Sequence, residues 1–472
     1  MKFPILKKIL LRLYNSYVKE HLRKLILALL LSFGVAGSTA SIAWLLDPAV
    51  KKIFIEHDET MMLLIPIAIV LAFTVKGLSL FLARTTTIRV GQLICKKLSV
   101  EMTSGILKSD SHTIESKHSG KYISHFLYDV GLINNLVSVG VLNIMKDSLT
   151  LIVLVSLMFY QNWKLAIFAI IMLPLAALVA KSLGRRIGKV VSESAVISGN
   201  LTAYLSEMIK GSRMIKIYQQ EKFESDRSNK ILTSLMEKQM KIGFVQIRAT
   251  PIMEVLTGIA IAVFIYYSGL MVATGEIEIN NFFSFLTAMM LAYQPIRSLA
   301  TINMLFYQGA GGAERVFDVI DTEVNIKEIE GSPNLIINKA NIDFKNVSFA
   351  YPKTNIDAIN NVNISIEGGS TAALVGHSGA GKSTIINLLP RFYDPNKGQI
   401  YIDGQNICNI TLSSLRKNIS LVSQDIILFD DTIRANIAYA NLSASNEQIK
   451  KACDLAAAAD FIEDLQQSYE TV

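Results

Sequence analysis

Six long apolar stretches in the first 310 residues constrain the fold of this chain more than any other feature. They cover residues 25–46, 61–83, 138–160, 163–183, 252–273 and 281–305. About 20 apolar residues span the hydrocarbon of a bilayer as a helix, which satisfies every backbone polar group within the segment. We therefore expect an all-α membrane domain with six transmembrane helices over residues 1–308.

The basic residues are grouped around these stretches rather than spread along the chain. Lys and Arg are frequent in residues 1–24, 84–136 and 184–246 and rare in the other connections. Because basic loops stay on the cytoplasmic side, both termini are expected in the cytoplasm. The net charge of +7 then favours membrane lipids as a partner and argues against nucleic acid.

The two long basic connections, residues 84–136 and 184–246, have apolar residues at helical spacing and few Pro or Gly breaks. This pattern is typical of helices, so they are expected to extend the spans into the cytoplasm as long helical extensions. A soluble domain inserted in each connection is the alternative. Segments of this length without clear strands would form only a marginal core, which favours the helical extensions.

A different domain is expected at residues 341–472, after a polar connector at 309–340. IDFKNVSFAY and NVNISIEGG alternate like strands, and TAALV has the composition of a short buried strand. GHSGAGKST follows at residues 376–384 and matches the phosphate-loop pattern between a strand and a helix. The second domain is therefore predicted to be an α/β nucleotide-binding domain.

The phosphate loop predicts a set of nucleotide-binding residues. Glycines let the backbone amides wrap around phosphate oxygens, Lys382 is expected to reach the β- and γ-phosphates, and Ser383 is expected to bind Mg²⁺. ATP with Mg²⁺ is the expected ligand, with GTP as the open alternative. The predicted residues are Gly376, His377, Ser378, Gly379, Ala380, Gly381, Lys382, Ser383 and Thr384.

Two residues outside the loop are further candidates. Tyr351, in FAYP, has an aromatic ring that could stack on adenine, although local packing at a strand edge explains it equally well. Gln424, in ISLVSQD, follows an expected buried strand and could contact the metal or the attacking water as a catalytic residue. An exposed polar strand end is the plainer explanation for Gln424.

The order of these motifs resembles that of half-transporters of the ABC exporter type. The resemblance rests on the six spans, VSFAYP, GHSGAGKST, RFYDPNKGQIYIDG and LVSQDIILFDDTIRANI, and MMLAYQPIRSLATINMLF is most similar to the lipid A flippase and multidrug branch. It implies an ATPase coupled to transport in a bacterial inner membrane. It also implies a homodimer, since such exporters hold ATP between two subunits.

The sequence departs from the family pattern after Gln424. No LSGGQ-type signature, no apolar strand ending in Asp-Glu and no switch histidine follows. We therefore expect a nucleotide-binding domain that is incomplete in this chain, with weak ATP binding and poor hydrolysis on its own. If the chain is an exporter, we expect it either to be part of a longer polypeptide or to be completed by a separate polypeptide.

The expected function is ATP-driven export or flipping of a lipid or amphipathic substrate. A membrane regulator that senses nucleotide without hydrolysing it is the alternative. Charged residues in spans usually face an interior cavity, so Lys96, Lys146 and Arg297 are predicted to form a basic ring around anionic lipid headgroups. Lys76 could equally extend its amine to the membrane surface. Hydrophobic drugs are the alternative cargo.

Overall fold

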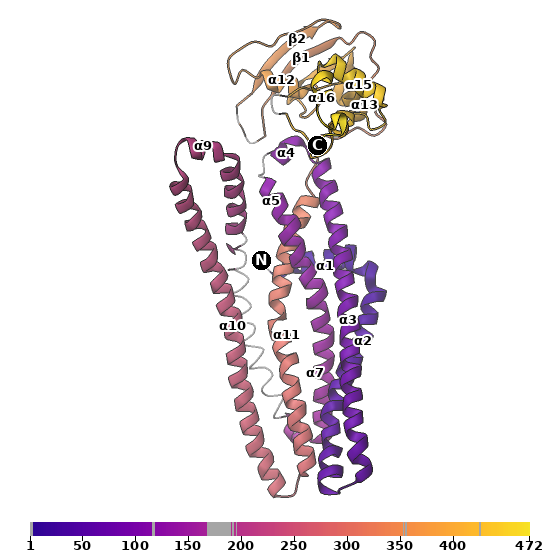
Figure 1. The fold of residues 1–472 in the computed structure, drawn as a ribbon, viewed down its shortest axis with the longest axis vertical. Coiled ribbons are helices and arrows are strands. Elements are labelled where there is room, and N and C mark those ends of the chain that lie inside the picture. Colours follow the sequence, from indigo (N-terminus) through magenta and orange to yellow (C-terminus); the bar gives the residue numbers. More distant parts are fainter. Residues whose placement is uncertain are drawn as a thin grey trace. The chain divides into compact units, whose positions relative to one another are not determined.

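The computed structural model describes residues 3–115, 119–167, 190, 193–194, 196–352, 354, 356–423 and 426–472. The chain forms two compact units, Met1–Asn325 and Ile326–Val472, which we call the N-terminal and C-terminal units. Long helices make up the N-terminal unit, and a small sheet with short helices makes up the C-terminal unit (Figure 1). This is the predicted combination of an all-α membrane domain with an α/β domain.

The N-terminal unit contains helices of very different lengths. Asp58 caps the N-terminus of helix Glu59–Lys108 by accepting hydrogen bonds from the amides of Thr60 and Met61, as expected for a capping carboxylate. The helices are α1 (Phe3–Leu13), α2 (Leu22–Pro48), α3 (Glu59–Lys108), α4 (Ser111–Glu115), α5 (Ser119–Ser124), α6 (Val130–Asn135), α7 (Val141–Gln161), α9 (Ser212–Ile217), α10 (Glu221–Ala273) and α11 (Ile279–Ile320). Wider turns, η4 (His125–Asp129) and η5 (Leu136–Gly140), join α5, α6 and α7.

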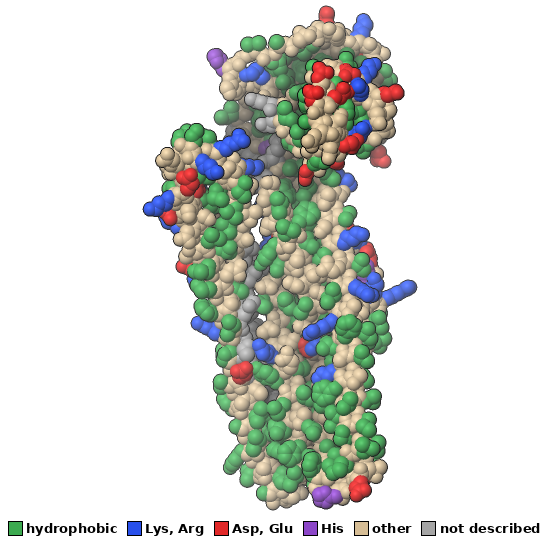
Figure 2. All heavy atoms as spheres, in the orientation of Figure 1, with side chains coloured by type: hydrophobic (Ala, Val, Ile, Leu, Met, Phe, Trp, Pro, Cys, Tyr) green, Lys and Arg blue, Asp and Glu red, His purple; other side chains and the backbone are tan. Residues whose placement is uncertain are grey.

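Four helical segments of the described chain are long and apolar enough to cross a membrane. They are Pro4–Ile55, Glu59–Lys108, Ser119–Gln161 and Glu254–Ala273. They contain the first, second and third predicted spans and all but the first two residues of the fifth. Figure 2 shows hydrophobic side chains covering most of the lower half of this unit, where charged side chains are few. A surface of this kind requires a lipid or protein environment.

The remaining two predicted spans have different outcomes. The fourth, at 163–183, lies mostly outside the described residues. Only residues 163–167 of this span are described, and they are helical. The sixth, at 281–305, lies inside α11, which is not one of the four apolar segments.

The connector predicted to begin at residue 309 is helical in its first part, because α11 continues to Ile320. Its glycines allow close contact between helices rather than a flexible link. A Cβ atom on Gly309 would lie 2.6 Å from the Cβ of Leu136, and one on Gly312 would lie 2.8 Å from the carbonyl oxygen of Asp129. Only glycine permits this approach, so Gly309 and Gly312 serve helix packing within α11 rather than a connector between domains.

A buried charge cluster lies at the same contact. Arg315 on α11 donates from Nε and Nη2 to the two carboxylate oxygens of Asp129, at 2.9 and 2.5 Å. The Nδ1 of His125 lies 2.6 Å from Asp129 Oδ2. Both His125 and Arg315 place side-chain nitrogens beside the buried Asp129 carboxylate. The cluster therefore joins η4 to α11 through a charged carboxylate.

The C-terminal unit is built on a four-stranded antiparallel sheet with the order β2-β1-β3-β4. The strands are β1 (Ile342–Phe349), β2 (Ile359–Ile366), β3 (Lys397–Ile402) and β4 (Gln405–Asn406), and the helices are α12 (Lys382–Leu388), α13 (Leu412–Lys417), α14 (Ile433–Ala438), α15 (Asn446–Leu455) and α16 (Ala459–Glu463). One face buries Phe344, Val347 and Ile400 against Leu388 and Leu415. The first two predicted strands are confirmed.

Two predicted buried strands are wrong. Residues 371–375 and 419–423 have no regular secondary structure, and Val375 and Val422 are 92% and 93% exposed. A central strand needs a hydrogen-bonded neighbour to form its ladder and to cover its side chains. Neither segment pairs with a strand of the described sheet, so both stay irregular and exposed.

Candidate functional site: a nucleotide cradle and a basic membrane cluster

The phosphate loop turns sharply into α12. Gly381 precedes this helix with φ +85°, a backbone conformation that favours glycine. A Cβ atom at Gly381 would lie 2.6 Å from Ile359 Cγ2 and 2.7 Å from the carbonyl oxygen of Ala358. The glycine therefore allows both the turn and its close contact with the start of β2.

Lys382 is folded back over the loop that it follows. Its ammonium donates to the carbonyl oxygens of Gly376 and His377, at 2.9 and 2.8 Å. Residues 376–380 are exposed and Gly381 is buried, so an anion has access to the amides of the exposed part of this turn. The structure thus brings the predicted loop residues into one cradle, with the lysine charge beside it.

The two hydroxyl residues after Lys382 have different environments. Thr384 is 4% exposed, whereas Ser383 is exposed and lies one residue after Lys382 at the start of α12. Mg²⁺ in nucleotide sites is usually held by one or two protein ligands together with phosphate oxygens. A single Ser383 hydroxyl at the cradle fits that requirement, and bound Mg²⁺ would neutralise phosphate charge there.

Tyr351 lies next to this helix, as its proposed role requires. Its hydroxyl is 3.1 Å from the Oγ1 of Thr384, and its ring is partly exposed. Gln424, the other candidate outside the loop, lies outside the described residues.

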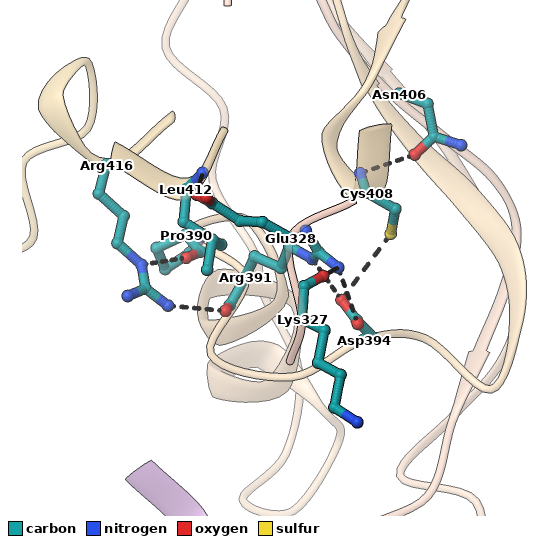
Figure 3. Close-up of polar contacts among 9 residues, drawn as sticks. All are labelled: Lys327, Glu328, Pro390, Arg391, Asp394, Asn406, Cys408, Leu412 and Arg416. Atoms are coloured by element: carbon teal, nitrogen blue, oxygen red, sulfur yellow. Dashed lines mark hydrogen bonds and ion pairs between the residues drawn. The ribbon is translucent and has the colours of Figure 1, made fainter. Parts of the chain in front are cut away.

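The segment between α12 and β3 is held by two arginines, the buried Arg391 and the exposed Arg416, which the sequence did not single out (Figure 3). Arg391 is 3% exposed. Its guanidinium donates to both carboxylate oxygens of Asp394, at 2.7 and 3.1 Å, and to the carbonyl of Lys327 at 3.2 Å. Arg416 donates to the carbonyls of Pro390 and Arg391, at 3.1 and 3.0 Å. The motif RFYDP contains both Arg391 and Asp394 and could have indicated this ion pair.

Asp403 ties the chain before β1 to the turn between β3 and β4. Its carboxylate accepts hydrogen bonds from the amides of Asn338, Lys339, Ala340 and Asn341 at 2.7 to 3.0 Å. The bond from Asn338, followed by the other amide bonds, lowers the pKa of Asp403 to about 2.

Replacing Asp403 with alanine should therefore expose these four amides to exchange. The folded pKa lies below the unfolded value of about 3.9, so the stabilisation is present above about pH 4 and is lost as the pH falls towards 2. Hydrogen exchange at residues 338–341 should accelerate in the variant at pH 7, and its thermal midpoint should approach that of the original chain near pH 2. An unchanged exchange pattern would contradict this role.

Lys146 lies near Lys76 on a neighbouring span, and we call these two residues together with Arg297 the basic cluster. Lys146 on α7 forms an ion pair with Asp147, which is 1% exposed, and lies near enough to Lys76 on α3 for the two like charges to repel each other. Lys96 lies twenty residues further along α3, or about 30 Å at 1.5 Å per residue. The structure therefore separates Lys96 from Lys146, and the residue on α3 that approaches Lys146 is Lys76.

Arg297 lies at the level of Lys146. A Cβ atom on Gly140 would be 3.9 Å from the Cβ of Leu305, which sets the register of two antiparallel helices. Arg297 precedes Leu305 by about two turns, and Lys146 follows Gly140 by a similar length, so the two basic residues reach nearly the same level. From the sequence alone, a position of the Lys76 amine at the membrane surface is as well supported as one in an interior cavity, because spacing does not show which helices are neighbours.

Known protein families match both units. Residues 25–296 match the ABC transporter transmembrane region, and residues 359–471 match the ABC transporter domain. The chain belongs to the ABC transporter family and has the fold of its exporters. In the fold comparison it is similar to a bacterial Atm1-family ABC exporter with ATP bound, with a TM-score of 0.83 and 25% identity over 97% of this chain and 80% of that one.

The sequence relatives narrow the branch. The chain is 38% identical over 439 residues to an ATP-dependent lipid A-core flippase of Syntrophus aciditrophicus, covering 93% of this chain and 73% of the flippase. It is 33% identical over 465 residues to the flippase of the same name from Desulfotalea psychrophila, covering 98% and 81%. The expected resemblance to the exporter branch that contains lipid A flippases is confirmed.

Proposed function

We propose that this chain is a half-transporter that uses ATP to move an anionic glycolipid of the lipid A type across a bacterial inner membrane. The observation that carries the proposal is the basic cluster of Lys76, Lys146 and Arg297 at one level of the spans. Its relatives are named as lipid A-core flippases, and the phosphate loop provides the nucleotide site.

The cluster is chemically suited to an anionic headgroup. Charged side chains within hydrocarbon depth are costly, so they usually face an interior cavity or one another. Lys146 is paired with Asp147, and cationic side chains at this depth are suited to form charge-assisted hydrogen bonds with lipid phosphates. A phosphate would also compete with Asp147 for Lys146, which favours reversible rather than permanent binding.

In this proposal two copies of the chain enclose the pathway, with both termini in the cytoplasm. ATP and Mg²⁺ are held at Lys382 and Ser383, and Gln424 is proposed to position the attacking water. Nucleotide favours one arrangement of the spans over the other through its differential affinity for the two states.

A double variant tests the lipid site without disturbing the buried ion pair of Lys146. Lys76→Gln with Arg297→Gln should weaken binding of lipid A to the chain in nanodiscs by about 10-fold or more, because two charge-assisted contacts are lost. Lys96→Gln is the matched control and should bind as the original chain does. Equal losses in both variants, or no loss in either, would exclude this cluster as the headgroup site.

ATP-dependent movement of labelled lipid A in proteoliposomes tests the activity itself. Movement that requires ATP supports the proposal. Lipid-independent ATP binding with no movement would favour the nucleotide-sensing regulator, and preferential binding of uncharged hydrophobic drugs would favour the other cargo.

A further inference from the structure

Three aromatic rings meet beside the phosphate-loop helix. The ring of Tyr351 packs nearly perpendicular to those of Phe349 and Tyr393, with centroid distances of 5.1 and 5.4 Å and interplanar angles of 78° and 86°. Phe349 and Tyr393 also contact each other at 5.2 Å. Neither neighbour is stacked flat on Tyr351, and its ring is partly exposed. The two neighbours therefore support the edge of the Tyr351 ring without occupying the face on which a planar ligand would stack.

A hydrogen bond from its hydroxyl group further restrains the position of the Tyr351 side chain. That group lies 3.1 Å from Thr384 Oγ1, and Thr384 is 4% exposed on α12, two residues after Lys382. Tyr351 itself follows β1. The hydrogen bond therefore joins the segment that carries the aromatic platform to the helix that carries the phosphate-binding lysine.

We propose that the Tyr351–Thr384 hydrogen bond sets the position of the adenine platform relative to the phosphate cradle, and that Tyr393 is a positioning residue for the same ring. The inference rests on the proposed ATP site. A ligand with both a base and phosphates gains from the fixed spacing, because its two ends find their subsites already aligned. A ligand with phosphates alone gains nothing from it.

A hydrogen bond that aligns two subsites and one that only stabilises the fold predict different binding results. A bond that only stabilises the C-terminal unit would affect all anionic ligands alike. A bond that aligns two subsites affects ATP selectively and leaves tripolyphosphate, which has no base, unchanged.

The test compares ATP with tripolyphosphate on the full chain in nanodiscs. Tyr351→Phe keeps the ring and removes the hydroxyl, and it should weaken ATP binding about 2- to 10-fold, as expected for one neutral hydrogen bond, with tripolyphosphate affinity unchanged. Thr384→Val should make Tyr351→Phe silent in a double-mutant cycle, whereas Thr384→Ser should keep the coupling. Tyr393→Leu should also weaken ATP selectively.

Tyr401→Phe is the matched control, since Tyr401 lies on β3 and its hydroxyl donates to Gln399 instead. It should leave both affinities unchanged. Unaltered ATP affinity in Tyr351→Phe, or equal loss of ATP and tripolyphosphate, overturns the inference. Failure of the original chain to bind ATP would instead overturn the proposed function on which it rests.

Discussion

Replacing Lys382 with alanine should lower the affinity of the chain for ATP by about 10- to 100-fold, the value for losing hydrogen bonds to a charged group. The lysine supplies a positive charge beside the exposed loop 376–380 and already contacts the Gly376 and His377 carbonyls. A fluorescent ATP analogue and the chain in nanodiscs give the measurement.

Lys397→Ala is the control for this variant. Lys397 is an exposed lysine on β3 of the same unit, so the two variants lose the same formal charge. A similar affinity loss in both would mean that only net charge matters. Unchanged ATP binding in Lys382→Ala would show that the cradle is not the nucleotide site.

Replacing Arg315 with alanine should destabilise the N-terminal unit by about 2–3 kcal/mol. Removing one partner of a buried ion pair typically costs about 3–5 kcal/mol because the other charge stays buried without compensation. We reduce this figure because the Arg315 side chain is 32% exposed, whereas that of Asp129 is 3% exposed. Thermal unfolding in detergent or nanodiscs measures the change.

Neutralising the stranded carboxylate should restore part of this stability. Asp129→Asn added to Arg315→Ala should unfold at a higher temperature than Arg315→Ala alone, because an amide is less costly to bury than a charge. Asp318→Ala, an exposed position on the same helix, should have little effect. A lower midpoint in the double variant would contradict the charge explanation.

Several predictions failed for related physical reasons. Gly309 and Gly312 were read as part of a connector, but they lie in α11 where only glycine permits contact with Leu136 and Asp129. The segments 371–375 and 419–423 have strand composition and still remain irregular. Composition gives the preference of a segment, whereas its conformation also depends on the neighbours that it finds.

What the sequence by itself determined is local or periodic: the long apolar stretches, the strand alternation, and the phosphate loop with its lysine. Those signals depend on residues close together along the chain. Only the tertiary structure decided that Lys76 rather than Lys96 approaches Lys146, and that Tyr351 reaches Thr384. These pairs depend on the register of elements far apart in sequence, which is set by side-chain packing between helices and strands.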